Sequence, residues 1–144
     1  MTDAQADARR PTTRVLVVDD EPAVAEVLRR LLAKDGYSVD VCHDGQEALT
    51  AMSTVRPHLV LCDVNMPGIT GIEVCRRLKQ DAAYRLTPVV MVTGQAQRDA
   101  RLEGLDAGAD DFLAKPVDPQ ELLIRVRSLV RIKRYTDDLA SAAS

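Results

Sequence analysis

Short runs of consecutive apolar residues recur along the chain, and segments of helical spacing separate them. Four of these runs cover residues 15–18, 59–62, 89–92 and 112–113. A strand buried on both faces needs apolar residues at every position, which is typical of a parallel sheet covered by helices on both sides. Residues 39–42 alternate apolar and polar side chains instead, which predicts an edge strand with one partly exposed face.

Amphipathic helices are expected between these strands. A helix that begins at Pro22 would place apolar residues three and four positions apart, namely Val24, Val27, Leu28, Leu31 and Leu32. Later helix starts are indicated by three groups of capping residues: Asp44 with Glu47, Thr70 with Glu73, and the run from Asp118 to Glu121. The helix at about residues 97–107 is poorly patterned and contains Gly104, so we expect it to be weakly held.

Five strands that alternate with helices define an α/β fold with a parallel sheet and helices on both faces. In such a sheet, ligands bind outside the carboxyl ends of the strands. We divide the chain into a disordered tail at residues 1–13, one domain at residues 14–134, and a helix extension or linker at residues 135–144.

Composition argues against several classes of function. A net charge of -3 and a pI of about 5.4 give no global nucleic-acid signature, and with no Trp and one Phe a base-stacking platform is not expected. No apolar run is long enough to span a bilayer, and the start of the chain has no signal-peptide pattern. Three isolated cysteines, Cys42, Cys62 and Cys75, fit small buried residues in a reducing cytoplasm.

Polar residues follow four of the predicted strands at their carboxyl ends. They are Asp19-Asp20, Asp63, Thr93 and Lys115, and they would converge at one edge of a parallel sheet. Three carboxylates repel one another, which would raise the pKa of at least one of them. A divalent cation such as Mg²⁺, which prefers oxygen ligands, relieves that repulsion, and an ammonium group can pair with a phosphoryl group. The cluster therefore predicts a site for a cation and a phosphoryl group.

Each member of this cluster also has an ordinary structural explanation. Asp19 and Asp20 could cap a helix, Thr93 could cap a turn, and Lys115 could be a solvated strand end. The joint occurrence of all four groups at strand ends favours the functional interpretation. His43 and His58 have no partners at metal-binding spacing, so we expect them to be surface or loop residues.

Four stretches of sequence carry a resemblance to a known family. They are VLVVDDEP at residues 15–22, LVLCDVNMPGITG at 59–71, PVVMVTG at 88–94 and GADDFLAKP at 108–116. Over about residues 14–134 the chain resembles the receiver domain of a bacterial two-component response regulator. The resemblance implies a flavodoxin-like, doubly wound, five-stranded parallel sheet of strand order 2-1-3-4-5.

The resemblance also implies a chemical role for each acidic residue. Asp63 would be the phospho-acceptor, which receives a phosphoryl group from the phosphohistidine of a histidine kinase or phosphotransfer protein. Asp19, Asp20, Asp63 and the backbone carbonyl of Asn65 would hold Mg²⁺ or Mn²⁺.

The remaining implied roles concern the switch. Lys115 would neutralise the phosphoryl group, and the Thr93 hydroxyl would donate to it; a cis peptide is implied between Lys115 and Pro116. Phe112 matches the aromatic switch position, and Phe cannot make an outer hydrogen bond. Phe112 therefore either switches through packing alone or is simply a core residue. The responding surface would comprise the helix at residues 97–107, the last strand and the last helix.

The last helix is the expected route to an output. Its basic residues, Arg125, Arg127, Arg131, Lys133 and Arg134, are typical of a solvated face rather than a nucleic-acid site. Leu129, Ile132, Thr136 and Leu139 would permit a short coiled coil, so a homodimer could form through this helix or through the responding surface. Residues 125–139 resemble the exit helix of receivers joined to cyclic-di-nucleotide enzymes or HD-type phosphodiesterases.

Two alternatives belong to other functional classes. A phosphatase with an Asp nucleophile usually has a second Asp two residues later, where this chain has Asn65. A flavin-binding protein of similar fold would need a hydroxyl- and Gly-rich loop after the first strand, where this chain has Asp19-Asp20-Glu21. We therefore expect a cytoplasmic signalling module with self-phosphotransfer and autodephosphorylation only, and with neither nucleic acid nor membrane as a partner.

Overall fold

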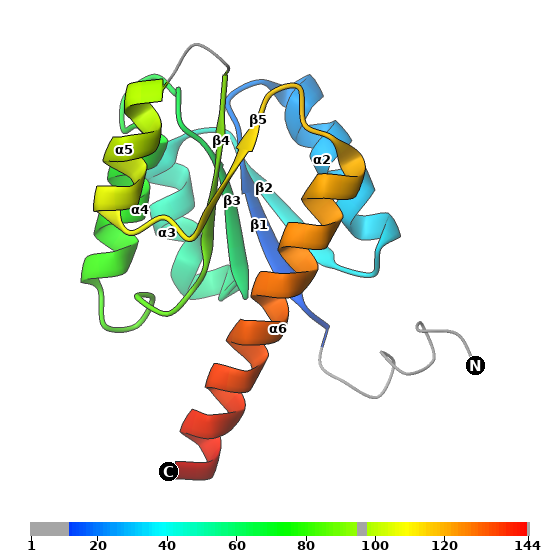
Figure 1. Ribbon diagram of the computed structural model, residues 1–144, viewed down its shortest axis with the longest axis vertical. Helices are drawn as coiled ribbons and strands as arrows, with labels where there is room; N and C mark the ends of the chain where they lie inside the picture. The colour runs from blue at the N-terminus through cyan, green and yellow to red at the C-terminus, as the bar shows by residue number, and fades with distance from the viewer. Residues whose placement is uncertain (1–11, 95–97, 144) are drawn as a thin grey trace.

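A parallel sheet of strand order β2-β1-β3-β4-β5 lies at the centre of the computed structural model, which describes residues 12–94 and 98–143 (Figure 1). The strands are β1 (Arg14–Val18), β2 (Ser38–Cys42), β3 (Leu59–Asp63), β4 (Val89–Thr93) and β5 (Asp111–Ala114). The helices are α2 (Pro22–Lys34), α3 (Gly45–Val55), α4 (Gly71–Gln80), α5 (Arg98–Ala107) and α6 (Pro119–Ala143). The expected fold class and strand order are confirmed.

The burial of each strand explains its sequence pattern. Strands β3 and β4 are buried at every position, and β1 is buried at all but its first residue. Strand β2 lies at an edge of the sheet and alternates between exposed and partly buried positions until Cys42, as its sequence predicts. Continuous apolar sequence therefore marks the central strands.

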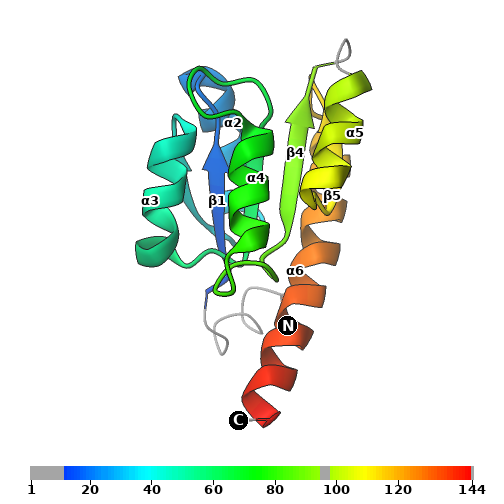
Figure 2. The same ribbon diagram turned by 90° about the vertical axis from the view of Figure 1, so that its left-hand side faces the viewer.

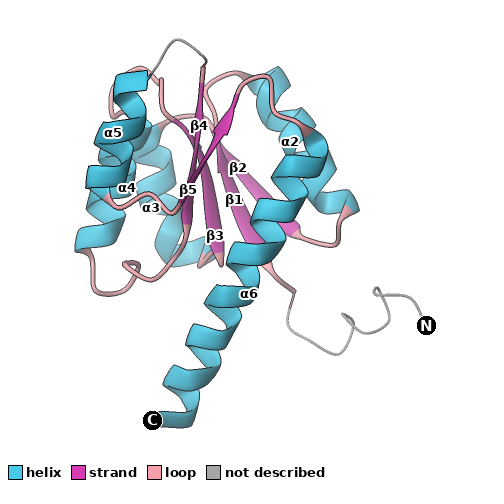
Figure 3. Cartoon of the chain, viewed as in Figure 1, coloured by secondary structure: helices cyan, strands magenta, loops and turns pink. Residues whose placement is uncertain are grey.

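Helices cover both faces of the sheet and create two separate apolar cores (Figure 3). Helices α3, α4 and α5 pack on one face, whereas α2 and α6 pack on the other. Successive strand side chains point to opposite faces, so Leu16 and Val18 enter the first core while Val15 and Val17 enter the second. The turned view in Figure 2 shows α6 extending well beyond the sheet.

The helix starts follow the capping residues in the sequence. Asp44 Oδ1 accepts a hydrogen bond from Glu47 N at 2.7 Å, and Thr70 Oγ1 accepts one from Glu73 N at 3.2 Å. Asp118 Oδ1 accepts from the backbone N–H groups at the start of α6. These side chains satisfy amide groups that have no partner within the helix.

Two positions differ from the sequence-based expectation. Val27 is 58% exposed, because α2 rests on the sheet through Ala25, Leu28 and Leu32, with Val24 and Leu31 packed beside them, and Val27 alone of the predicted face turns to solvent. Residues 1–11 of the expected tail lie outside the described residues, but Thr13 is buried and its carbonyl accepts a hydrogen bond from Ser38 N at 2.9 Å. Thr13 thus packs with the domain.

The C-terminal segment continues α6 as far as Ala143. Residues 135–143 are therefore helical, in line with the helix-extension alternative. In the part of the chain that the structure describes, no helix has both the length and the apolar composition needed to cross a membrane.

Gly104 in α5 has a packing reason that its sequence context does not reveal. A Cβ atom at this position would lie 2.8 Å from both Cε1 and Cζ of Phe112, which is buried beneath the helix. The guanidinium of Arg101 lies 5.6 Å from the centroid of the same ring, a distance that suits a cation–π contact. The Phe112 ring thus occupies space that only glycine leaves open.

Replacing Gly104 with Ala should therefore destabilise the protein, although alanine is the better helix former by about 1 kcal/mol. Overpacking against Phe112 costs about 1–3 kcal/mol, so we expect a net loss of about 1 kcal/mol in the free energy of unfolding, measured with urea. In a Phe112→Leu background the same substitution should be neutral or stabilising. An equal loss in both backgrounds would contradict the proposed contact.

Candidate functional site

The carboxyl ends of β1, β3, β4 and β5 bring four polar side chains to one edge of the sheet, the upper edge in Figure 1. Asp19 is 1% exposed, Asp63 is 5% exposed and Thr93 is 7% exposed. Lys115 follows β5 and is partly buried. The strands that carry these residues are otherwise lined with apolar side chains, so the polar groups are concentrated at this edge.

Lys115 is the centre of the site's ion pairs. Its Nζ lies 3.3 Å from Asp19 Oδ2 and 3.3 Å from Asp63 Oδ2, and 4.0 Å from Glu21 Oε1. The structure thus brings together predicted residues that are 44 and 52 positions apart, as their numbers in the sequence show. One ammonium group faces three carboxylates, two of which are nearly inaccessible to water.

This imbalance of charge shifts the pKa values of both Asp63 and Lys115. Burial raises the pKa of Asp63, the Lys115 charge opposes that change, and the neighbouring Asp19 charge adds to it. Burial also tends to lower the pKa of Lys115, but the attraction of Asp63 and Asp19 outweighs it, so that pKa is raised. A single positive charge cannot satisfy two buried negative charges. The site is therefore short of positive charge.

The loop after β3 fixes the position of Asp63. Asn65 N donates a hydrogen bond to Asp63 Oδ1 at 3.3 Å, while Asp63 Oδ2 faces Lys115. Gly71 begins α4 directly against this loop: a Cβ there would lie 2.1 Å from the carbonyl oxygen of Asp63. Only glycine permits this close approach. The role of the Asn65 carbonyl as a metal ligand stays a prediction.

The acidic residues have the chemistry of a divalent-cation site. Asp19, Asp20 and Glu21 each offer a carboxylate oxygen, and within the described part of the chain these oxygens lie within 4.8 Å of one another. Asp19 Oδ2 is buried and accepts no hydrogen bond, and the Lys115 ammonium 3.3 Å from it is shared with Asp63. A buried carboxylate oxygen is costly unless positive charge satisfies it, and a bound cation would supply the charge that is missing. An all-oxygen donor set suits Mg²⁺ or Mn²⁺.

Sequence reasoning did not identify Glu21 as a member of this cluster. Its adjacency to Asp19-Asp20 was the available signal, but an acidic residue before a helix is also common at a helix start. In the structure Glu21 is the N-cap residue of α2 and its side chain makes no capping hydrogen bond. Asp19 Oδ1 instead accepts from Glu21 N at 2.9 Å, so neither aspartate caps the helix through its side chain.

The structure also places the predicted cis peptide, the aromatic residue of the last strand and the two histidines. The peptide bond between Lys115 and Pro116 is cis, the geometry that the resemblance implies. Phe112 is buried in the core beside α5, on the strand that leads to Lys115. The ring of His43 lies 3.1 Å from the carbonyl oxygen of Asp19, and His58 Nδ1 accepts from Arg14 N at 3.0 Å. Both histidines thus have local hydrogen-bond partners.

The sequence matches the response regulator receiver domain model over residues 15–127. The chain belongs to the response regulator receiver family. It is 46% identical over 130 residues to the response regulator MprA of Mycobacterium avium, and 45% identical over 132 residues to MprA of Mycobacterium tuberculosis. These alignments cover 90% and 92% of this chain but 56% of each relative, so the chain spans little more than half the length of these relatives.

Solved structures share the fold. The chemotaxis protein CheY4 of Vibrio cholerae superposes with a TM-score of 0.78 at 32% identity, covering 83% of this chain and 99% of CheY4. The receiver domain of a signal transduction histidine kinase from Syntrophus aciditrophicus gives a TM-score of 0.79 at 34% identity, covering 83% and 91% of the two chains. The domain is therefore a two-component receiver with a CheY-like fold.

Replacing Asp63 with Asn should stabilise this receiver at neutral pH when divalent cations are removed with EDTA. The pKa of Asp63 is raised on folding, so the folded state binds more protons than the unfolded state between the two pKa values. Stability then falls as pH rises through that interval, and below the ordinary Asp pKa of about 3.9 the penalty is absent.

Urea unfolding of the wild type and Asp63→Asn at several pH values tests this expectation. The stability difference should grow from acidic to neutral pH. The exposed Asp138→Asn substitution controls for the change in net charge. If the gain from Asp63→Asn did not depend on pH, the assigned origin of the penalty would be wrong.

Proposed function

We propose that this receiver accepts a phosphoryl group on Asp63 from the phosphohistidine of a histidine kinase or phosphotransfer protein. The observation that carries the proposal is the position of Lys115 Nζ, 3.3 Å from both Asp63 Oδ2 and Asp19 Oδ2 at the sheet edge. An Asp63 oxygen attacks phosphorus; the new O–P bond forms as the P–N bond breaks. The bonding electron pair leaves with the imidazole nitrogen.

The surrounding residues fit this transfer. Lys115 offers a positive charge to the phosphoryl oxygens, and Thr93, at the end of the neighbouring strand β4, offers a hydroxyl donor. Asn65 N holds Asp63 Oδ1 and so orients the carboxylate. Mg²⁺ or Mn²⁺ held by Asp19, Asp20, Asp63 and the Asn65 carbonyl would supply the remaining charge neutralisation.

We propose that the site acts on its own phosphoryl group and not on a separate substrate. Asn65 stands where an Asp-based phosphatase would have a second carboxylate, which supports self-phosphotransfer and autodephosphorylation only.

A reducing cytoplasm suits the three cysteines, which are free and buried; burial raises the pKa of Cys42 to about 12 and that of Cys75 to about 11.

The proposed output is a change in the surface formed by α5, β5 and α6. Thr93 and Phe112 are the switch residues that we propose: Thr93 ends β4, and Phe112 on β5 packs against α5 at Gly104. Leu102 and Leu105 on α5 and Ile124 on α6 are exposed, which supports this surface as a contact for a second copy or an output partner.

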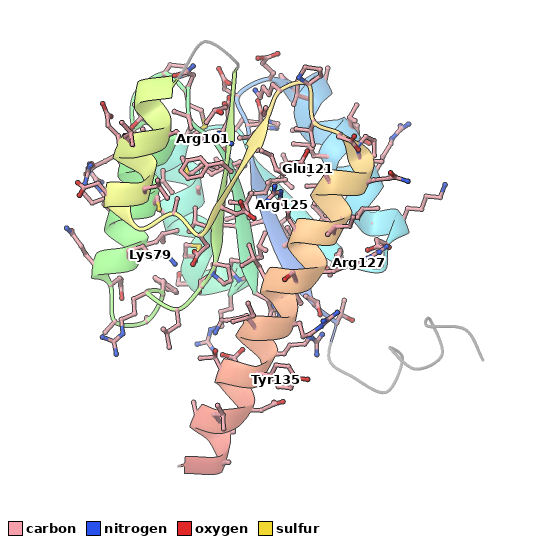
Figure 4. The ribbon with its side chains drawn as sticks, viewed as in Figure 1. Lys79, Arg101, Glu121, Arg125, Arg127 and Tyr135 are labelled. Atoms are coloured by element: carbon pink, nitrogen blue, oxygen red, sulfur yellow. The ribbon has the colours of Figure 1, made fainter. Side chains whose placement is uncertain are left out.

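The extension of α6 offers a second dimer surface. Its exposed apolar residues are Ile132, Tyr135 and Leu139. Ile132 and Leu139 belong to the expected set, whereas Leu129 and Thr136 are partly buried and the Thr136 hydroxyl donates to the Ile132 carbonyl. Figure 4 shows Tyr135 on the segment that projects from the domain. Spacings of three and four residues suit a two-helix coiled coil.

Ion pairs within the chain support the exclusion of nucleic acid as a partner. Arg125 contacts Asp111 at 2.7 Å and Glu121 at 3.1 Å, and Arg127 contacts Asp35 at 2.6 Å; Figure 4 labels these two arginines on α6. Lys133 pairs with Asp137. Much of the basic stripe is thus neutralised by acidic side chains of the domain, as expected for a solvated face.

Incubation with Mg²⁺ and a small phosphodonor such as acetyl phosphate should add one phosphoryl group to the wild type, measured by intact mass. Asp63→Asn should gain none, and wild type in EDTA should gain far less, because the carboxylates would repel the donor. Asp138→Asn is the matched control and should react like the wild type. An unmodified wild type would refute the proposal, and turnover of an added phosphoester would favour a phosphatase.

Two lysine substitutions should identify the dimer surface. Sedimentation of the phosphorylated protein should show a dimer that Leu139→Lys abolishes if the α6 extension mediates it, since burial of an unpaired charge opposes association. Ile124→Lys disrupts the α5–β5–α6 surface instead and serves as the comparison. A dimer that neither substitution weakens would rule out both surfaces.

A further inference from the structure

Glu21 lies at the mouth of the acidic site, and its carboxylate does not cap the helix that follows. Glu21 is the N-cap residue of α2, but its side chain makes no capping bond, and Pro22 begins the helix. The side chain is 64% exposed, so packing does not force its direction. Its carboxylate nevertheless lies within 4.8 Å of those of Asp19 and Asp20.

We propose that Glu21 is a fourth carboxylate of the cation site, on its solvent side, and that it sets how tightly the receiver holds a divalent cation before phosphorylation. This inference rests on the proposed phosphoryl-acceptor function. It adds a ligand outside the set of Asp19, Asp20, Asp63 and the Asn65 carbonyl. The ligand acts directly or through one water, because Mg²⁺ keeps several waters in its octahedral shell.

The Lys115 ammonium explains why the Glu21 side chain points toward the acidic site. Its ammonium lies 4.0 Å from Glu21 Oε1 and 3.3 Å from Asp19 Oδ2. A flexible exposed glutamate can be hydrated anywhere around its Cα, yet here it turns toward the positive charge that the two buried aspartates share. The carboxylates of Asp19, Glu21 and Asp63 therefore all face Lys115.

The turn that precedes α2 supplies an independent observation. Glu21 N donates to Asp19 Oδ1 at 2.9 Å, which ties the two residues together and uses that oxygen. The other oxygen, Asp19 Oδ2, is buried and accepts no hydrogen bond. Lys115 Nζ lies 3.3 Å from this oxygen and is shared with Asp63, so it offsets the charge only in part and a cation beside the exposed carboxylate of Glu21 would complete the neutralisation. Affinity for hard cations rises with the number of charged oxygen ligands.

The test is titration of the unphosphorylated full chain with MnCl₂, with free Mn²⁺ measured by electron paramagnetic resonance. Glu21→Gln should weaken binding by about tenfold, the lower end of the effect expected when a residue around a metal site is removed. Glu21→Asp keeps the charge but shortens the reach, so it should also weaken binding. Glu103→Gln, an exposed glutamate on α5, should bind like the wild type. Asp19→Asn should bind least.

The outcomes separate this inference from the proposed function. If the wild type binds Mn²⁺ and Glu21→Gln binds equally well, the assignment of Glu21 falls while the phosphoryl-acceptor function stands. If Glu21→Asp binds like the wild type and the Glu21→Gln defect disappears at about 1 M salt, the residue contributes only a screened field, and the assignment is overturned. A wild type that binds no Mn²⁺ overturns the cation site and Glu21 with it.

Discussion

The ion contacts between Lys115 and the buried pair Asp19 and Asp63 are the interaction on which the site depends. Two carboxylates in a largely water-free environment carry a high desolvation cost, and one ammonium offsets only part of it. The raised pKa of Asp63 reflects this deficit, with burial as its first cause. The site therefore lowers the free energy of unfolding while it leaves negative charge that a cation can neutralise, and such a cost in stability is common at functional sites.

The parallel sheet is what makes this arrangement possible. Strands β1, β3 and β5 end at the same edge, so residues distant in the chain meet without long loops. Their continuous apolar sequence buries the strands on both faces and leaves their ends as the place for polar groups. Gly71 then lets α4 begin against the backbone of Asp63, which holds the loop after β3 in a fixed path.

Sequence alone predicts the sheet, its edge strand and the convergence of Asp19, Asp63 and Lys115, because these follow from local composition and from the geometry of parallel strands. It does not predict the rotation of a helix about its own axis, which decides the side chains that pack on the sheet. The exposure of Val27 depends on which line of side chains the sheet accepts, whereas Ile132 and Tyr135 are exposed because α6 continues beyond the sheet. The sequence does not predict that the Glu21 carboxylate lies beside those of Asp19 and Asp20, because the spacing of apolar residues does not determine the direction of one exposed side chain.

Strand β5 is the element best placed to connect the site with the output surfaces. Lys115 follows its end, Phe112 faces the core beneath α5, and Leu113 faces the core beneath α6. A shift of Lys115 on phosphorylation would therefore act on both helices through adjacent residues of one short strand. Phe112 fills the space that Gly104 leaves open, so its ring packs directly against α5. We therefore propose that the signal passes as a joint displacement of strand and helix between two packed arrangements, and not as the rotation of one free side chain.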